Sequence, residues 1–180
     1  MGRKSSWNMN LENLHKLKEN LKHRPCIQVG VFQKKDARKE EGMTNATLAA
    51  IHEFGAPEHG LAARSVLKVP ISEHAKEIME SMKGKADMIV KATNIKSLWS
   101  LVGVACEKVI SRAFDTGGYG KWAPLRYETL MKKLNKGKFR NLHRRKLTIA
   151  HIFSGNIGMG ILIDRGELRK AYLSRVVMKF

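Results

Sequence analysis

The sequence predicts an α+β fold in which an antiparallel sheet packs against one long helix. The longest regular apolar face runs at helical spacing from Leu98 to Ala113. Alternating apolar and polar residues at 26–33 and 147–153 indicate strands. Helices and strands do not alternate in the rhythm of a parallel βαβ sheet, which favours the antiparallel class. The length of 180 residues suits a single domain over 1–180.

The first two elements follow from apolar spacing. An amphipathic N-terminal helix is expected over 10–24, ending before Pro25, because four leucines share one helical stripe: Leu11, Leu14, Leu17 and Leu21. The strand at 26–33 is expected to bury the face formed by Ile27, Val29 and Val31. The charged stretch 34–42 is then a solvated loop.

A short helix is expected from 45 to 54. Thr44 or Asn45 can cap its start, and Gly55 can end it in a left-handed conformation that other residues resist. Residues 55–60 are expected to form a turn or an exposed loop. The chain should then run extended through 64–69 into Pro70, with the next helix over 71–82.

The long helix is expected to end at the glycine-rich stretch 115–120. A short helix should follow to about residue 134, and the basic stretch 132–146 is expected to be a mobile arm because it has little to bury. Segments 147–153 and 157–163 are expected to pair as a hairpin. Asp164 and Glu167 are spaced as a capping box for a helix through Tyr172, followed by a strand over 174–180.

Charge is the most unusual property of the chain. Lys and Arg number 34 against 16 Asp and Glu, a net charge of +18, and the last 60 residues hold 15 basic and only 3 acidic side chains. Such a field attracts polyanions or acidic protein surfaces. Eight cations fall within fifteen residues: Lys132, Lys133, Lys136, Lys138, Arg140, Arg144, Arg145 and Lys146. The alternative for this basic run is a solvated loop without a specific partner.

The compartment is expected to be a reducing cytosol. Cys26 and Cys106 are the only cysteines and should be free thiols. The apolar runs are shorter than the roughly 20 residues that cross a bilayer, and the first ten residues lack the apolar stretch of a signal peptide. No membrane partner is expected.

Enzymatic motifs are incomplete, so neither an enzyme nor a cofactor or metal site is expected. His52 and Glu53 begin like a zinc-protease motif, but Ala56 stands where the second histidine belongs. His59 is a weak substitute ligand. Lys121 follows a glycine-rich stretch, but Trp122 replaces the hydroxyl residue of a phosphate loop. A hydrolase that uses His52 and Glu53 remains a third and less favoured hypothesis.

The order of several short motifs resembles one known family. The motifs are VGVF at 29–32, TNATLAAIHEFG at 44–55, ARSVL at 63–67, WAPL at 122–125 with Thr129 and the lysines at 132–133, and LIDRGEL at 162–168. In this order they are similar to the tail-completion, or head–tail joining, neck proteins of long-tailed double-stranded DNA phages. The chain departs from the family pattern at Leu61-Ala62, Ser65 and Arg165, where the family has Ile-Pro, Pro and Thr.

The resemblance implies a non-enzymatic virion protein made in the host bacterial cytoplasm. Copies of it would form a ring, commonly a hexamer, that completes the tail or joins it to the head connector. A closed ring needs a heterologous interface, in which one patch meets a different patch of the next subunit. The partners implied are other copies, connector proteins and tail-tube or tail-terminator proteins, with non-specific contact to packaged DNA. Five residues are candidates for the subunit or partner interface: His52, Glu53, Phe54, Arg64 and Trp122.

Four of the five interface candidates have an ordinary structural alternative. Glu53 and Arg64 are expected either to be surface charges or to form an ion pair, within the turn or across a subunit boundary. Phe54 is expected in the core rather than as an anchor for a partner, and Trp122 as a packed cover at a helix end rather than a binding hot spot.

The basic run at 132–146 leaves two partner classes open. Six copies at +18 would hold a sliding DNA too tightly, so docking of the run to an acidic neighbouring ring is favoured over a DNA-lined lumen. The alternative function is a small basic nucleic-acid-binding protein, in which this run is the binding surface.

Overall fold

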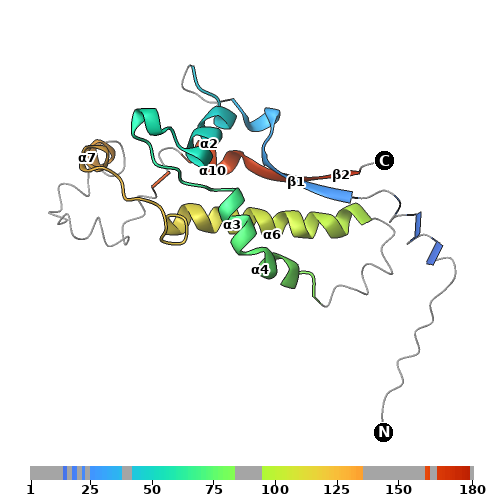
Figure 1. The fold of residues 1–180 in the computed structure, drawn as a ribbon. Helices are drawn as coiled ribbons and strands as arrows, with labels where there is room; N and C mark the ends of the chain where they lie inside the picture. The colour runs from blue at the N-terminus through green and yellow to red at the C-terminus, as the bar shows by residue number, and fades with distance from the viewer. Residues whose placement is uncertain are drawn as a thin grey trace, which may run out of the picture.

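The fold is α+β: a two-stranded antiparallel sheet packs against one long helix, as predicted (Figure 1). The computed structural model describes residues 14–15, 18–19, 22, 25–37, 42–83, 95–135, 161–162 and 166–178. Strand β1 (Pro25–Val31) pairs with β2 (Tyr172–Met178), with Pro25 opposite Met178 and Val31 opposite Tyr172. The sheet therefore pairs a segment near residue 30 with one near residue 175.

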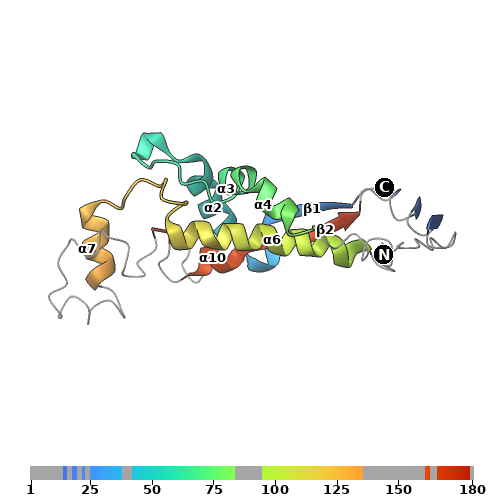
Figure 2. The same ribbon diagram turned by 90° about the horizontal axis from the view of Figure 1, so that it is seen from below.

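Helix α6 (Ile95–Thr116) is the centre of the fold. It lies along the sheet and contacts both strands, and Figure 2 shows α3 and α4 on one side of it and α10 on the other. Gly103 allows the close approach of helix and sheet, because a Cβ at this position would collide with the Ser174 side chain. The prediction that this helix organises the core is confirmed.

Two hydrophobic clusters make up the core, and α6 contributes to both. Ile110 and Phe114 belong to the first cluster, together with Val66, Leu168 and Tyr172. The second cluster consists of Ile78, Val102, Cys106 and Val109. The face of β1 predicted to be buried packs on these clusters through Ile27, Val29 and Val31.

Helix α2 (Asn45–Phe54) is fixed to the end of β1 through its first turn. The Thr44 side chain accepts a hydrogen bond from the Thr47 N–H, the predicted cap, and the Asp36 carboxylate accepts one from the Ala46 N–H. Asn45 is buried, and its amide donates to the carbonyl oxygens of Lys35 and Ala37. The expected loop over 34–42 therefore includes a 3-10 turn, η1 (Gln33–Lys35), that holds α2.

The next helical region begins earlier than predicted. Helix α3 (Lys68–Glu73) starts two residues before Pro70, and α4 (Ala75–Glu80) follows it. Pro70 is tolerated because the first turn of a helix leaves backbone N–H groups without intrahelical partners. The expectation of an extended segment through Val69 is wrong, because a side chain from α2 caps α3, as described below.

The remaining elements agree with the sequence in part. Helix α7 (Tyr127–Asn135) lies where a short helix was predicted. Helix α10 (Glu167–Ala171) begins directly after Gly166, which is its N-cap and has a φ of 77°. The predicted capping box is therefore wrong, because Glu167 is the first helical residue rather than the third. Ile161 and Leu162 form a turn rather than the end of the expected strand. Strand β2 begins at Tyr172, two residues before its predicted start.

Several predictions concern residues outside the described ranges. These are most of the N-terminal helix over 10–24, of which Leu14, His15, Lys18, Glu19 and Lys22 are described and helical, the basic segment 136–146, and the hairpin segments 147–153 and 157–160. Within the described helices, none has both the length and the hydrophobicity needed to cross a bilayer.

Candidate functional site

The C-terminal end of α2, the loop after it and the start of α3 form one corner of the molecule, which we call the α2–α3 corner (residues 52–69). Its loop is a tight reversal: Ala56 and Leu61 form a bridge with two hydrogen bonds of 3.0 Å, around the 3-10 turn η2 (Pro57–His59). Arg64 N–H donates to the His52 carbonyl at 2.6 Å, which closes the reversal onto α2. Four of the five interface candidates lie in this corner.

Gly55 is required at the helix end. Its φ is 76° and its ψ is 179°, a combination that only glycine adopts readily. A Cβ there would also lie 2.9 Å from the Ala63 nitrogen. The predicted positive φ is confirmed, although the backbone is extended in ψ rather than in the left-handed helical region.

Glu53 is the central polar residue of the corner. Its carboxylate accepts hydrogen bonds from the Ser65 hydroxyl at 2.6 Å and from three successive backbone N–H groups at 2.9–3.0 Å: Val66, Leu67 and Lys68. Ser65 Oγ in turn accepts the Val69 N–H at 3.0 Å. Because Pro70 has no N–H, every donor at the start of α3 is satisfied.

These hydrogen bonds also determine the ionisation of Glu53. Burial raises its pKa, but the bonds from Ser65, Leu67, Lys68 and Val66 together lower it further, so the pKa lies below the ordinary value. Glu53 is therefore an anionic helix cap. Of the alternatives expected for Glu53 and Arg64, an ion pair within the turn is not formed, because each side chain has other partners.

Arg64 instead joins the corner to the segment after α6. Its guanidinium donates to the Ala123 carbonyl at 3.2 and 3.3 Å and to the Pro124 carbonyl at 3.4 Å. Burial lowers the pKa of Arg64 from its ordinary value. Arg126 makes a similar contact, donating to the Gly60 carbonyl at 3.2 Å. Two arginines thus connect the loop to residues 123–126.

Trp122 packs inward, as the structural alternative predicted. Its indole N–H donates to the Ser65 carbonyl at 3.2 Å, and its ring meets Phe114 edge-on, with centroids 6.2 Å apart. The ring lies against Gly118, where a Cβ would collide with it. Trp122 therefore holds the corner against the core of the first cluster.

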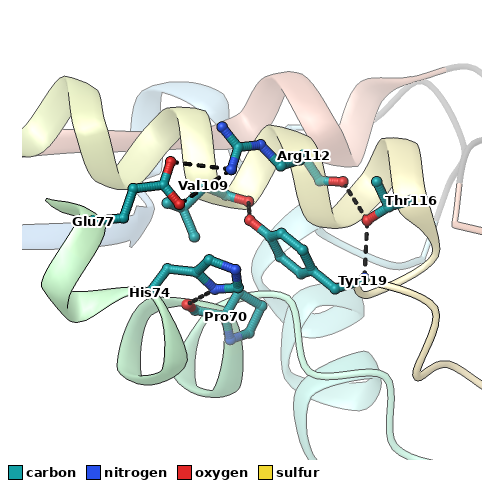
Figure 3. A network of polar contacts seen from close by, with 7 residues as sticks. All are labelled: Pro70, His74, Glu77, Val109, Arg112, Thr116 and Tyr119. Carbon is teal, nitrogen blue, oxygen red and sulfur yellow. Dashed lines mark hydrogen bonds and ion pairs between the residues drawn. The ribbon is translucent and has the colours of Figure 1, made fainter.

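The turn between α6 and Trp122 has an unusual backbone conformation. Gly117, Gly118, Tyr119 and Gly120 all have positive φ, between 58° and 80°. Tyr119, the only non-glycine among them, is held by three contacts (Figure 3): its N–H donates to Thr116 Oγ1 at 2.9 Å, its hydroxyl donates to the Val109 carbonyl at 3.0 Å, and its ring stacks on His74 at 4.0 Å. These contacts offset the strain of a left-handed tyrosine.

A second part of the same network joins α4 to α6. Arg112 donates to both oxygens of Glu77, at 3.0 and 3.1 Å, beside the stacked rings of His74 and Tyr119 (Figure 3). Sequence reasoning did not identify this network, because its members come from three separate segments. The glycines around Tyr119 are sufficient to predict a turn. Nothing in the sequence indicates that Tyr119 itself has a positive φ.

Phe54 points away from the core. Its side chain is 77% exposed, so the expectation that it belongs to the core is wrong. Phe54 is one of the residues that line an open depression of about 210 Å³. The other lining residues come from β1, α2, the start of α3 and β2: Gly30, Val31, Ala46, Ala49, Ala50, Glu53, Leu67 and Tyr172. Leu61 of the loop is also exposed. Phe54 and Leu61 thus place two exposed apolar side chains on the same hydrogen-bonded corner, and these are its candidate contact residues.

The other candidates are placed as follows. His52 is half-buried and directly precedes Glu53 in the last turn of α2. Of the eight cations in the basic run, Lys132 is exposed on α7, Lys133 belongs to the same helix, and the other six lie outside the described residues. Across the part of the chain that the structure describes, no group of three or more metal-ligating side chains comes together, His52 and His59 included.

Comparisons of the chain with protein-family models, curated proteins and solved structures gave no match.

Proposed function

We propose that this chain is a structural protein of the neck of a long-tailed double-stranded DNA phage, where copies of it form a ring that completes the tail or joins it to the head connector. The proposal starts from the ordered motifs, of which the segments at 49–55 and 63–67 are the most informative. Glu53 of the first segment caps the helix that follows the second. The two motifs are therefore one structural unit.

The observation that carries the proposal is the exposure of Phe54 on this unit. Its backbone is fixed by α2 on one side and by the hydrogen-bonded loop on the other. Fixed apolar anchors suit a protein whose task is repeated contact, because little side-chain or loop entropy is lost on binding. A ring requires two different complementary patches on each subunit. Phe54 and the depression that it lines would be one of these patches.

The test is the composition of phage particles. Infectious particles of the phage that encodes the chain should contain it in a fixed, small number of copies, and electron microscopy should place a ring of it at the head–tail junction. Purified chain added to tail tubes should cap them as a discrete ring. Absence of the chain from infectious particles, or its loss from them without effect on head–tail joining, would falsify the proposal.

The charge of the C-terminal third supports one other function, a small nucleic-acid-binding protein. This function predicts submicromolar binding to duplex DNA or RNA at physiological salt, within the range of such proteins. Replacement of the eight cations at 132–146 by Gln should abolish that binding. A neck protein with the same replacements should lose particle assembly instead.

A further inference from the structure

A groove between α4 and α6, which we call the α4–α6 groove, has an apolar floor. Its volume is about 350 Å³, and all of its lining residues lie in the described ranges. Ile78 and Val109 are buried members of the second hydrophobic cluster, whereas Val104 is 45% exposed. The apolar lining consists of Ile78, Leu101, Val104, Ala105 and Val109. A pocket of this kind can receive an apolar side chain from another molecule.

The rim of the α4–α6 groove carries one cation that has no partner among the described residues. Glu77 and Arg112 also line the groove, but they pair with each other at 3.0 and 3.1 Å (Figure 3). Lys108 lies one helical turn before Arg112 on α6 and is exposed. The groove therefore fits an occupant that combines an apolar group with a negative charge.

The α2–α3 corner presents both of these groups. Phe54 is 77% exposed, and no large apolar side chain among the described residues is more exposed. Glu58 of η2 lies four residues further on, is exposed, and has no cationic partner among the described residues. The hydrogen bonds between Ala56 and Leu61 fix the backbone that carries Glu58. Little loop entropy is therefore lost when the corner binds.

The groove and the corner also match in size and in placement. A cavity of about 150 Å³ holds a benzene molecule, so the groove has room for the phenyl ring of Phe54. In Figure 1, α2 lies above α6 and α4 lies below it. The two surfaces therefore belong to different faces of the chain, as a heterologous contact between copies requires.

The net charge of the chain does not exclude a contact between copies here. Residues 1–120, which contain both surfaces, hold 19 basic and 13 acidic side chains, so they account for only +6 of the total of +18. At physiological salt, exposed charges more than about 8 Å apart are largely screened. The interaction across the contact therefore depends mainly on the unpaired charges nearest to it, Glu58 and Lys108, which are of opposite sign.

We infer that the α4–α6 groove is the second patch of the ring interface: it receives Phe54 of a neighbouring copy, while Glu58 of that copy pairs with Lys108 on the rim. Each copy then offers its corner to one neighbour and its groove to the other, a contact that repeats around a ring. The inference rests on the proposed function and adds to it the residues that join one copy to the next.

A charge swap tests the inference. E58K and K108E, each supplied in place of the wild-type chain, should reduce incorporation into phage particles about tenfold or more, because like charges then face each other across the contact. The double variant E58K/K108E should recover most of this loss, because the pair is restored with its signs exchanged. The matched control E128K/K108E places the new lysine on α7 instead and should not recover it. Circular dichroism and thermal midpoints should stay unchanged, since all three residues are exposed.

Covalent links between copies provide an independent readout. In a C26S background, which removes the partly exposed native thiol, particles that carry E58C/K108C are treated with a short bismaleimide. Because each copy has both new thiols, we expect a ladder of linked multimers up to the complete ring. The single variants and E128C/K108C should give no such ladder.

The outcomes separate the inference from the proposed function. Recovery by the charge swap together with a ladder supports the inference. If particles contain the wild-type chain but E58K/K108E recovers nothing, or E58C/K108C gives no ladder, the α4–α6 groove does not receive the corner of the next copy. The proposed function stands in that case. Particles that lack the wild-type chain overturn both.

Discussion

The Glu53 carboxylate accepts a hydrogen bond of 3.0 Å from the backbone N–H of Leu67, fourteen residues further along the chain. It does the same for the two neighbouring N–H groups of Val66 and Lys68. One side chain of α2 therefore replaces the cap residue that α3 lacks, since Leu67 at the N-cap position has no side-chain acceptor. The corner is held by this carboxylate rather than by an ion pair.

Replacement of Glu53 by Ala should lower the free energy of unfolding by about 1 to 3 kcal/mol, because partly buried N–H groups lose their acceptor. Glu53→Gln should have a smaller effect. Urea unfolding at pH 7 measures both, with Glu58→Gln as the control at an exposed carboxylate of the same loop. An E53A protein as stable as the wild type would show that water satisfies these donors.

The same carboxylate should make stability depend on pH. The pKa of Glu53 is lower in the folded chain than its ordinary value, so its stabilising contribution is present above the pKa of the unfolded chain and is lost as pH falls through the folded pKa. The difference in unfolding free energy between wild type and E53Q should therefore shrink as pH falls below about 4.3. Urea unfolding at several acidic pH values measures this difference. If the difference in unfolding free energy between wild type and E53Q stays constant with pH, the prediction is wrong.

Gly118 and Gly120 form a matched pair for testing the contact with Trp122. Both have positive φ, but only a Cβ at Gly118 would collide with the Trp122 ring, while the space at Gly120 is open. Gly120→Ala should cost about 1 to 2 kcal/mol for the backbone alone. Gly118→Ala should cost more and should change tryptophan fluorescence. Equal thermal midpoints for the two variants would contradict the packing described for Trp122.

The hydroxyl of Tyr119 should matter most at alkaline pH. Burial is the main cause that raises its pKa, so the phenol stays protonated in the folded chain at pH values where the unfolded chain begins to ionise. The stability that the protonated phenol of Tyr119 contributes is therefore present below about pH 10 and is lost as pH rises above it. Tyr119→Phe should therefore lose less stability between pH 9 and about 11 than the wild type does.

The control for this titration is Tyr127→Phe, which removes a phenol from an exposed helix. At pH 7, Tyr119→Phe should itself cost about 1 kcal/mol, because the hydrogen bond to the Val109 carbonyl is lost. Urea unfolding at both pH values gives the two quantities separately. If Y119F and wild type lose stability in parallel, the phenol does not ionise differently in the two states.

Phe54→Ser should separate assembly from stability. Since the side chain is mostly solvent-exposed, the free energy of unfolding should change by no more than about 0.5 kcal/mol. Incorporation into particles, or ring formation on tail tubes, should fall strongly. Met79→Ser, at another exposed apolar residue, should leave assembly intact. Assembly-competent F54S particles would remove Phe54 from the interface.

The periodicity of apolar residues was sufficient to predict helices and strands whose signals lie within the element itself. The strand at Pro25–Val31, the helix capped by Thr44 and the long helix that ends at Thr116 were all predicted, because apolar spacing and cap residues lie within the elements themselves. The α+β class follows from the same patterns. These features depend on neighbours a few residues away.

Features that depend on distant residues could not be predicted in the same way. Helix α3 begins before Pro70 because Glu53 caps it, and Arg64 contacts carbonyls 59 and 60 residues away instead of the nearby Glu53. The exposure of Phe54 likewise depends on where the loop turns, since its position at a helix end fits either a buried or an exposed side chain. The local sequence pattern singles out Glu53, Arg64 and Phe54, but it does not predict which residues they contact.

The pairing of β1 with β2 has a consequence for synthesis of the protein. The cross-strand hydrogen bond from Arg175 to Gln28 spans 147 residues, so the sheet cannot close until the ribosome has released almost all of the sequence described here. Until then the apolar face of β1 and the long helix lack their covering strand. Contacts at such separation slow folding and leave nascent chains open to aggregation, so we expect translation rate and chaperones to influence the yield of this protein.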